Sequence, residues 1–303
     1  MHWKYLYLCK NDYPDKIHIA PITPDDVYIL TRHGICVFIE PSDNRIYEDG
    51  EYVEKSGILT NIPMISPSQC LAVSWSKSYE QDPTISRVHE EYPHMYVSDM
   101  PTSEPCSHLA GYVACGLGLS QFFVKNMGNE SLENLGQWET KNDFKIQLSQ
   151  MFDLCTWPSV SIGIIGSTSE CGIGVTSMLN EFALKYVHVT DKTTCTIFDI
   201  LFYCNSQEND RDEPWFSTEC ISTTRGSYRS RIWVDVASSH GTTKHPFRNL
   251  YNTHTTLAKP VINICDTLDI IALDDYCMIL PRVASNEISK TLVQLFMNQS
   301  RPQ

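Results

Sequence analysis

The stretch SIGIIGSTSECGIGVTS, residues 161–177, decides the fold of this chain. It begins with an apolar run rich in isoleucine, which is typical of a buried strand, and continues as a polar, glycine-containing segment. A second run of strand-forming residues, FALKYVHV over 182–189, follows it. We therefore expect two strands joined by a tight polar turn, with the functional loop in that turn.

The first part of the chain has the same composition of short strand-forming runs separated by turn residues. The runs are KYLYL (4–8), KIHIA (16–20), DVYIL (26–30) and GICVFIE (34–40), and PSDN (41–44) and EDG (48–50) are the turns. This pattern predicts an antiparallel β-barrel or sandwich. The region from Gln81 to Asp153 keeps no sustained period, and we interpret it as long connections around a few strands.

The end of the chain is different in character. After the apolar run CTIFDILFYC (195–204) and an acidic loop, the stretch SNEISKTLVQLFMNQ carries apolar residues at helical spacing. The apolar residues are Ile288, Leu292, Leu295 and Phe296, and Ser285 or Asn286 is the N-cap candidate. We expect a separate, partly helical C-terminal domain.

Composition narrows the classes of function. The chain has 303 residues, 42% of them hydrophobic, which is enough for a substantial core, and a net charge of -13 argues against a nucleic-acid partner. The chain has twelve cysteines that lack the regular short spacings of a disulfide-rich domain, which fits a reducing compartment. The sequence contains no CxxC pair, so a structural zinc site is not expected. No apolar run reaches the roughly 20 residues that span a bilayer, and the first residues do not resemble a signal peptide.

Two motifs carry chemistry. In GSTSECGIG, Cys171 follows Ser169 and Glu170 and precedes Gly172, as a nucleophilic thiolate at a sharp turn requires if backbone N–H groups are to form an oxyanion hole. In DDVYILTRHGIC (25–36), a run of strand-forming residues delivers His33. The alternatives are a buried cysteine in a hairpin loop and a structural histidine.

The order of three motifs resembles a known family. DDVYILTRHGIC is similar to the segment that carries the catalytic histidine in the 3C-like main proteases of coronaviruses and other nidoviruses. GSTSECGIG resembles the nucleophile loop of that family, and KYVHVTD (185–191) resembles its Tyr-x-His strand at the floor of the S1 pocket.

The resemblance implies a mainly β fold, a chymotrypsin-like double β-barrel followed by a partly helical C-terminal domain. The domains would be 1–85 with His33, 86–196 with an insertion, Cys171 and the S1 pocket, and 197–303. The implied function is a viral cysteine endopeptidase that processes a polyprotein after Gln or Glu with a Cys-His dyad. Its partners would be these peptides and a second copy of the chain, in the host cell cytoplasm, without cofactor, metal, nucleic acid or membrane insertion.

The resemblance also assigns the site. His33 is the general base and Cys171 the nucleophile, and the oxyanion hole consists of the backbone at Ser169, Glu170 and Cys171. The substrate-binding residues are Tyr186, His188, Asp191 and Gly166.

Several positions depart from the family pattern. Ser169 replaces a glycine, Glu170 replaces a small residue and Gly166 replaces an aromatic residue, while the gap between His33 and Cys171 requires an insertion. A third, acidic member of the site is not assigned, although four carboxylates lie in a suitable window and would otherwise be solvated turn charges: Glu48, Asp49, Glu51 and Glu54.

The main alternative is a degenerate P-loop pseudo-GTPase that acts as an interaction module. SIGIIG followed by SECGIGVTS then forms the strand and loop, RIWVDVASS (231–239) the metal-binding strand, and Val175 stands where the phosphate-binding lysine belongs. A viral structural protein without catalysis is a third hypothesis. The segment MLNEFALKY (178–186) discriminates, because the protease requires a strand there and the P-loop protein a helix.

Overall fold

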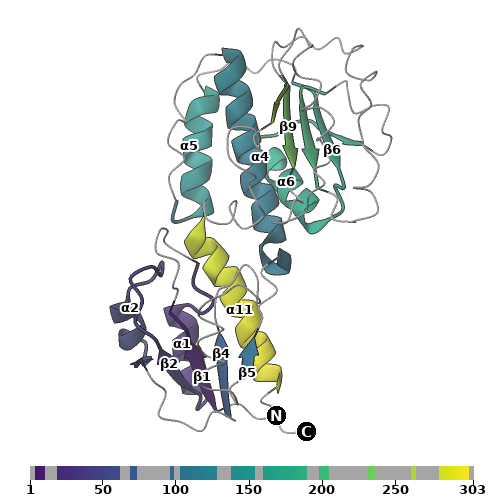
Figure 1. Cartoon of the computed structure of the whole chain (residues 1–303). Helices are drawn as coiled ribbons and strands as arrows, with labels where there is room; N and C mark the ends of the chain where they lie inside the picture. Colours follow the sequence, from purple (N-terminus) through teal and green to yellow (C-terminus); the bar gives the residue numbers. More distant parts are fainter. Residues whose placement is uncertain are drawn as a thin grey trace. The chain divides into compact units, whose positions relative to one another are not determined.

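The computed structural model divides the chain into two compact units (Figure 1). Unit 1 comprises residues 1–105 and 281–303, and unit 2 comprises residues 106–280, whereas the predicted boundaries fall after residues 85 and 196. The structure describes residues 4–10, 19–61, 69–73, 96–98, 103–127, 138–153, 160–189, 198–204, 231–235, 261–263 and 280–299.

Unit 1 is built on a five-stranded sheet in the order β3-β2-β1-β4-β5, in which every pairing is parallel. The strands are β1 (Tyr5–Leu8), β2 (Cys36–Ile39), β3 (Ile58–Leu59), β4 (Cys70–Val73) and β5 (Tyr96–Ser98). Leu6, Val37 and Ala72 are fully buried at the centre of this sheet. The chain order reverses beside β1, because β2 lies on one side of it and β4 on the other.

Helix α1 (Pro24–Arg32) occupies most of the segment that carries His33. Thr23 is its N-cap and accepts a hydrogen bond from the N–H of Asp26, and Pro24 is the first residue of the helix. The carboxylates of Asp25 and Asp26 lie in the first turn, where they interact favourably with the positive end of the helix dipole. The prediction of a strand over DVYIL is therefore wrong. The short helix α2 (Asp49–Glu54) lies beside α1.

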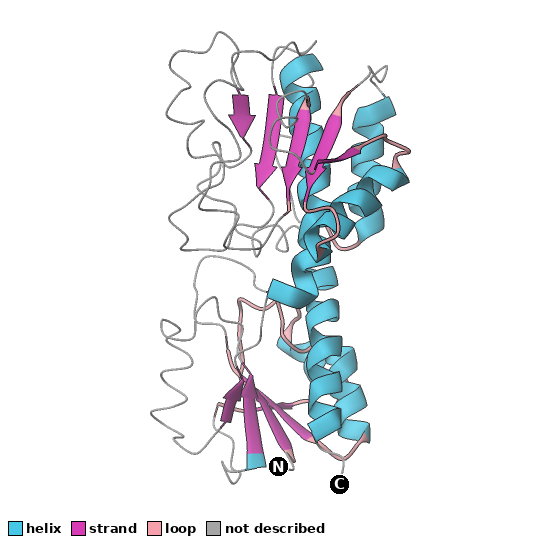
Figure 2. Ribbon diagram, turned by 90° about the vertical axis from the view of Figure 1, so that its right-hand side faces the viewer, coloured by secondary structure: helices cyan, strands magenta, loops and turns pink. Residues whose placement is uncertain are grey.

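Helix α11 (Pro281–Gln299) confirms the helix predicted near the end of the chain, although it begins before the predicted cap and belongs to unit 1. It lies against α1 (Figures 1 and 2). Its buried serine hydroxyls form hydrogen bonds with the N-terminal part of the chain. Ser285 accepts the N–H of Ala20 at 2.9 Å, and Ser289 donates a short hydrogen bond to the buried carboxylate of Asp26.

Unit 2 contains a second five-stranded sheet in the order β10-β9-β8-β6-β7, again with only parallel pairings. The strands are β6 (Ile162–Ile165), β7 (Val187–Val189), β8 (Ile200–Tyr203), β9 (Arg231–Asp235) and β10 (Val261–Asn263). The predicted strand SIGIIG is present, whereas only Val187–Val189 of the predicted run FALKYVHV forms a strand, and the two strands are parallel neighbours joined by a helix.

Three described helices belong largely or wholly to unit 2: α4 (Ser103–Met127), α5 (Lys141–Asp153) and α6 (Glu170–Glu181). Figure 1 shows α4 running past the sheet, between α5 and α6. Every residue of α4 from Leu109 to Ser120 is buried, so this helix is part of the core. The predicted long connections between Gln81 and Asp153 are therefore wrong for 103–127 and 141–153.

The double β-barrel is contradicted by this architecture. Parallel strands require crossovers, and helices cover the sheets of both units, which makes the chain α/β with two doubly wound, Rossmann-like units (Figure 2). Within the described ranges, no helix combines the length and apolar character needed to cross a membrane.

Candidate functional site

The turn between β6 and α6 is the most distinctive local structure in unit 2. Gly166 follows β6 with φ of +72°, Ser167 and Thr168 form the turn, and Ser169 caps α6. The Ser169 hydroxyl accepts the N–H of Gly172 at 3.1 Å. A buried apolar strand, one glycine in the left-handed region and a serine cap thus bring the chain from the sheet into a helix within four residues.

This turn lies at a topological switch point. The chain leaves β6, forms α6 and returns as β7 on one side of β6, and β8 then pairs with the other side. In open α/β sheets, ligands bind outside the carboxyl ends of the strands at such a reversal. The carboxyl ends of β6 and β8, at Ile165 and Tyr203, therefore define the candidate site.

A single hydroxyl connects the two strand ends. The Ser169 Oγ lies 2.7 Å from the carbonyl oxygen of Gly166 and 2.7 Å from that of Cys204, the residue after β8. The backbone N–H of Cys204 also donates to Ile165 at 2.9 Å. The turn is therefore attached to β8 as well as to its own strand.

Gly172 allows the helix to start this close to the strand. A Cβ at this position would lie 2.3 Å from the Gly166 carbonyl oxygen and 2.6 Å from the Ser167 Cα, distances that side chains do not tolerate. In dinucleotide-binding turns the third glycine of the G-x-G-x-x-G fingerprint permits the same close packing of helix and strand. Counted from Gly166, Thr168 and Cys171 hold the second and third fingerprint positions, and Gly172 comes one residue later.

The electrostatics of the turn are mixed. The first turn of α6 presents backbone N–H groups and the positive end of the helix dipole, which favour an anion. Glu170 is exposed in that same turn, and its carboxylate opposes an anion there. The turn thus offers hydroxyls and amides to a phosphate group, with one charge against it.

The structure places the predicted catalytic residues in different units. Cys171 lies in the first turn of α6 in unit 2 and is buried, whereas a protease nucleophile must be accessible to a peptide. His33 caps the C-terminus of α1 in unit 1, is exposed, and holds its Nδ1 2.8 Å from the Ile29 carbonyl oxygen. The predicted roles of general base and nucleophile depended on a double β-barrel, and the structure has two parallel sheets in its place.

The remaining predicted residues are partly brought together. Gly166, Ser169 and Glu170 share the β6–α6 turn, where helix geometry replaces the predicted oxyanion hole. Tyr186 and His188 make an edge-to-face ring contact with centroids 5.4 Å apart, and His188 is exposed on β7. Asp191 lies outside the described residues.

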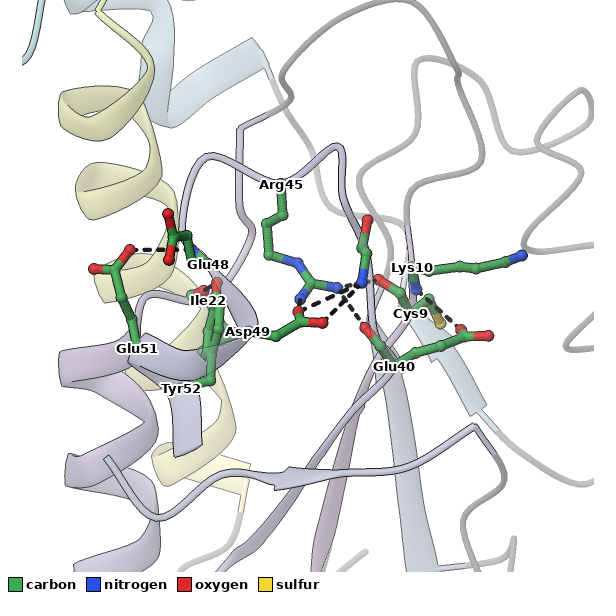
Figure 3. Close-up of polar contacts among 10 residues, drawn as sticks. Cys9, Lys10, Ile22, Glu40, Arg45, Glu48, Asp49, Glu51 and Tyr52 are labelled. Carbon is green, nitrogen blue, oxygen red and sulfur yellow. Dashed lines mark hydrogen bonds and ion pairs between the residues drawn. The ribbon is translucent and has the colours of Figure 1, made fainter. Parts of the chain in front are cut away.

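Unit 1 carries a largely buried polar cluster that was not predicted from the sequence (Figure 3). Arg45 donates to the Cys9 and Glu40 carbonyl oxygens at 3.3 and 2.9 Å, at the carboxyl ends of β1 and β2, and forms an ion pair of 3.3 Å with Asp49. Its guanidinium also lies over the Tyr52 ring. We call these five residues the Arg45 cluster.

Three of the four carboxylates considered as a third catalytic member have local partners, and the fourth, Glu54, is exposed. Asp49 pairs with Arg45, and Glu48 and Glu51 form a capping box at the start of α2. Burial raises the pKa of Tyr52 well above its usual value, and its hydroxyl donates to the Ile22 carbonyl oxygen at 2.8 Å. The cluster therefore fixes the loops at the carboxyl edge of the unit 1 sheet.

The part of the chain that the structure describes contains no group of three metal-ligating side chains.

Comparison with solved structures identifies the fold. The chain is similar to a transhydrogenase from Sinorhizobium meliloti, with 11% identity and a TM-score of 0.54 over 96% of this chain and 92% of the other. It is also similar to an L-alanine dehydrogenase, with 12% identity and a TM-score of 0.56 over 97% and 90% of the two chains. No protein-family model and no curated protein sequence matches the chain. The viral protease interpretation is wrong, because both similar structures have the Rossmann-like fold, and the P-loop alternative has no support either.

Proposed function

We propose that unit 2 binds a nicotinamide dinucleotide with its diphosphate at the β6–α6 turn, and that the chain is an oxidoreductase. The observation that carries the proposal is the position of this strand–glycine–helix turn, at the switch point between β6 and β8. The likeness in fold to a transhydrogenase and an L-alanine dehydrogenase, along nearly the whole chain, supports the oxidoreductase class.

The residues of the turn fit a diphosphate. Gly166 has the left-handed conformation that lets backbone approach a ligand, and Gly172 holds the helix start against the turn. The half-buried Ser167 and the exposed Thr168 add hydroxyl donors between them. A bound nicotinamide group supplies hydride transfer, while the residues named here bind and orient the diphosphate.

Binding of the dinucleotide to the full chain tests the proposal. We expect NADH or NADPH to bind in a fluorescence titration, and Ser167→Asp to weaken that binding at least about tenfold, because a carboxylate in the turn repels the diphosphate. Asn180→Asp is the matched control, since it adds the same charge at an exposed position near the other end of α6. Absence of binding by the wild type, or equal binding by Ser167→Asp, would refute the proposal.

A further inference from the structure

The hydroxyl of Ser169 has more acceptors around it than it has protons. It accepts the Gly172 N–H at 3.1 Å, and the carbonyl oxygens of Gly166 and Cys204 both lie 2.7 Å from its Oγ. A serine hydroxyl donates one hydrogen bond at a time. One of the two carbonyl oxygens therefore receives the proton.

Both contacts are 2.7 Å long, and only the one to the Cys204 carbonyl oxygen links the turn to another strand. The Gly166 carbonyl oxygen already accepts the Ser169 backbone N–H at 3.0 Å, so the turn is closed without the hydroxyl. Donation to Cys204 instead joins the first turn of α6 to the end of β8, on the opposite side of the switch point. Two roles thus meet in one side chain, a helix cap through its lone pair and a bridge to β8 through its proton.

We infer that Ser169 is a positioning residue of the nucleotide site, which holds the diphosphate-binding turn at a fixed place relative to β8. The inference rests on the proposed function. Binding groups that are held in place before the ligand arrives lose less conformational freedom on binding, so removing the bridge weakens affinity. A residue that only capped α6 would affect stability alone.

A cap of the same kind in the same unit separates the two roles. Thr140 precedes α5, and its Oγ1 accepts the Asp143 N–H at 3.1 Å, far along the chain from the β6–α6 turn. Ser169→Ala and Thr140→Ala each remove one helix cap, so both are expected to lower the melting temperature. Ser169→Gly is a second variant, because it also removes both hydrogen bonds of the hydroxyl, while glycine at an N-cap costs the helix less stability than alanine does.

The experiment measures melting temperature and the dissociation constant for NADH in the full-length wild type and variants. We expect Ser169→Ala and Ser169→Gly to raise the dissociation constant at least fivefold, Ser169→Thr to stay within twofold of wild type, and Thr140→Ala to bind as wild type. If the wild type binds NADH and both Ser169→Ala and Ser169→Gly bind equally well, the inference is wrong and the proposed function stands. If the wild type does not bind, both fail. If Ser169→Ala does not fold, Ser169→Gly decides.

Discussion

Gly111 of α4 faces the carbonyl group of Cys171 so closely that a Cβ on Gly111 would lie 1.9 Å from that oxygen. The contact is reciprocal, because a Cβ on Gly174 of α6 would lie 2.0 Å from the His108 carbonyl oxygen. The two helices therefore meet backbone to backbone beside the first turn of α6. The position of the candidate site depends on this contact as well as on the strand that precedes it.

Gly111→Ala tests the helix contact. We expect it to lower the free energy of unfolding by about 3 kcal/mol or more, since a methyl group there meets backbone atoms that have no alternative rotamer. Gly50→Ala in α2 is the control, because nothing lies within 4 Å of that Cβ position. It is expected to be neutral or to stabilise by up to about 1 kcal/mol. The measurement is urea unfolding monitored by circular dichroism. Equal unfolding midpoints for the two variants would contradict the close contact.

The Arg45 cluster gives a second prediction about stability. Arg45→Met removes the guanidinium that two buried carbonyl oxygens and the Asp49 carboxylate contact. We expect this substitution to lower the free energy of unfolding by about 3 kcal/mol. Arg45→Lys recovers only part of this loss, because an ammonium cannot match the planar geometry of a guanidinium.

Lys55→Met supplies the control for the Arg45 cluster, since it breaks the Lys55–Asp25 ion pair, in which both side chains are well exposed. Exposed pairs contribute little to stability because water screens them. Chemical denaturation of the three variants gives the comparison, and an Arg45→Met loss no greater than that of Lys55→Met would contradict the buried arrangement.

Alkaline pH provides a third test through Cys70. Burial raises the pKa of the Cys70 thiol from 9.0 to about 12. The unfolded chain loses this proton at lower pH than the folded chain, so this group's contribution to stability is complete below pH 9 and is lost as pH rises toward 12.

We therefore expect the free energy of unfolding to fall above pH 9, with Cys70 contributing a slope of about 1.4 kcal/mol per pH unit. Cys70→Ala should show a shallower decline than the wild type between pH 9 and pH 11, measured by urea unfolding at each pH. Parallel curves would show that Cys70 ionises in both states alike.

The strands were easier to predict than their arrangement. Tyr5–Leu8, Cys36–Ile39 and Ile162–Ile165 lie in runs predicted as strands, because β-branched and aromatic side chains suit a sheet. Their parallel direction was missed, although strands buried on both faces appear in the sequence as continuous apolar runs. The protease expectation required antiparallel hairpins and so obscured this signal.

Two helices were missed for different physical reasons. α4 is buried on all sides over 109–120, so it has no polar face and no helical period for a sequence pattern to reveal. α1 has a clear start signal in Thr23, Pro24 and two aspartates, but the β-branched residues that follow outweighed it.

The segment that forms the candidate site was predicted from the sequence, but its structure and its chemistry were not. Gly166, Ser169 and Glu170 were singled out from the sequence, yet the segment after them was predicted as turn and strand where α6 continues to Glu181. A strand, a glycine-containing loop and a helix were predicted at this place only by the P-loop alternative, and the protease motifs outweighed that pattern. The homodimer stays a prediction.

Glu170 carries a negative charge that opposes the proposed ligand. Its carboxylate lies in the first turn of α6, close to where a diphosphate would meet the helix N-terminus. Removing a charge of the wrong sign at such a position changes a free energy by about 0.3 to 1 kcal/mol at low ionic strength. Glu170→Gln should therefore lower the dissociation constant for NADH about two- to fivefold. This gain in affinity should shrink near 0.3 M salt, where the Debye length is about 6 Å and the interaction is screened.

Glu54→Gln is the control, because Glu54 is an exposed carboxylate on α2 in unit 1 and its substitution removes the same charge without touching the turn. Equal effects of the two variants would attribute the change to net charge, and a loss of affinity in Glu170→Gln would mean that the carboxylate itself contacts the ligand, as it would if it accepted a ribose hydroxyl instead of facing phosphate.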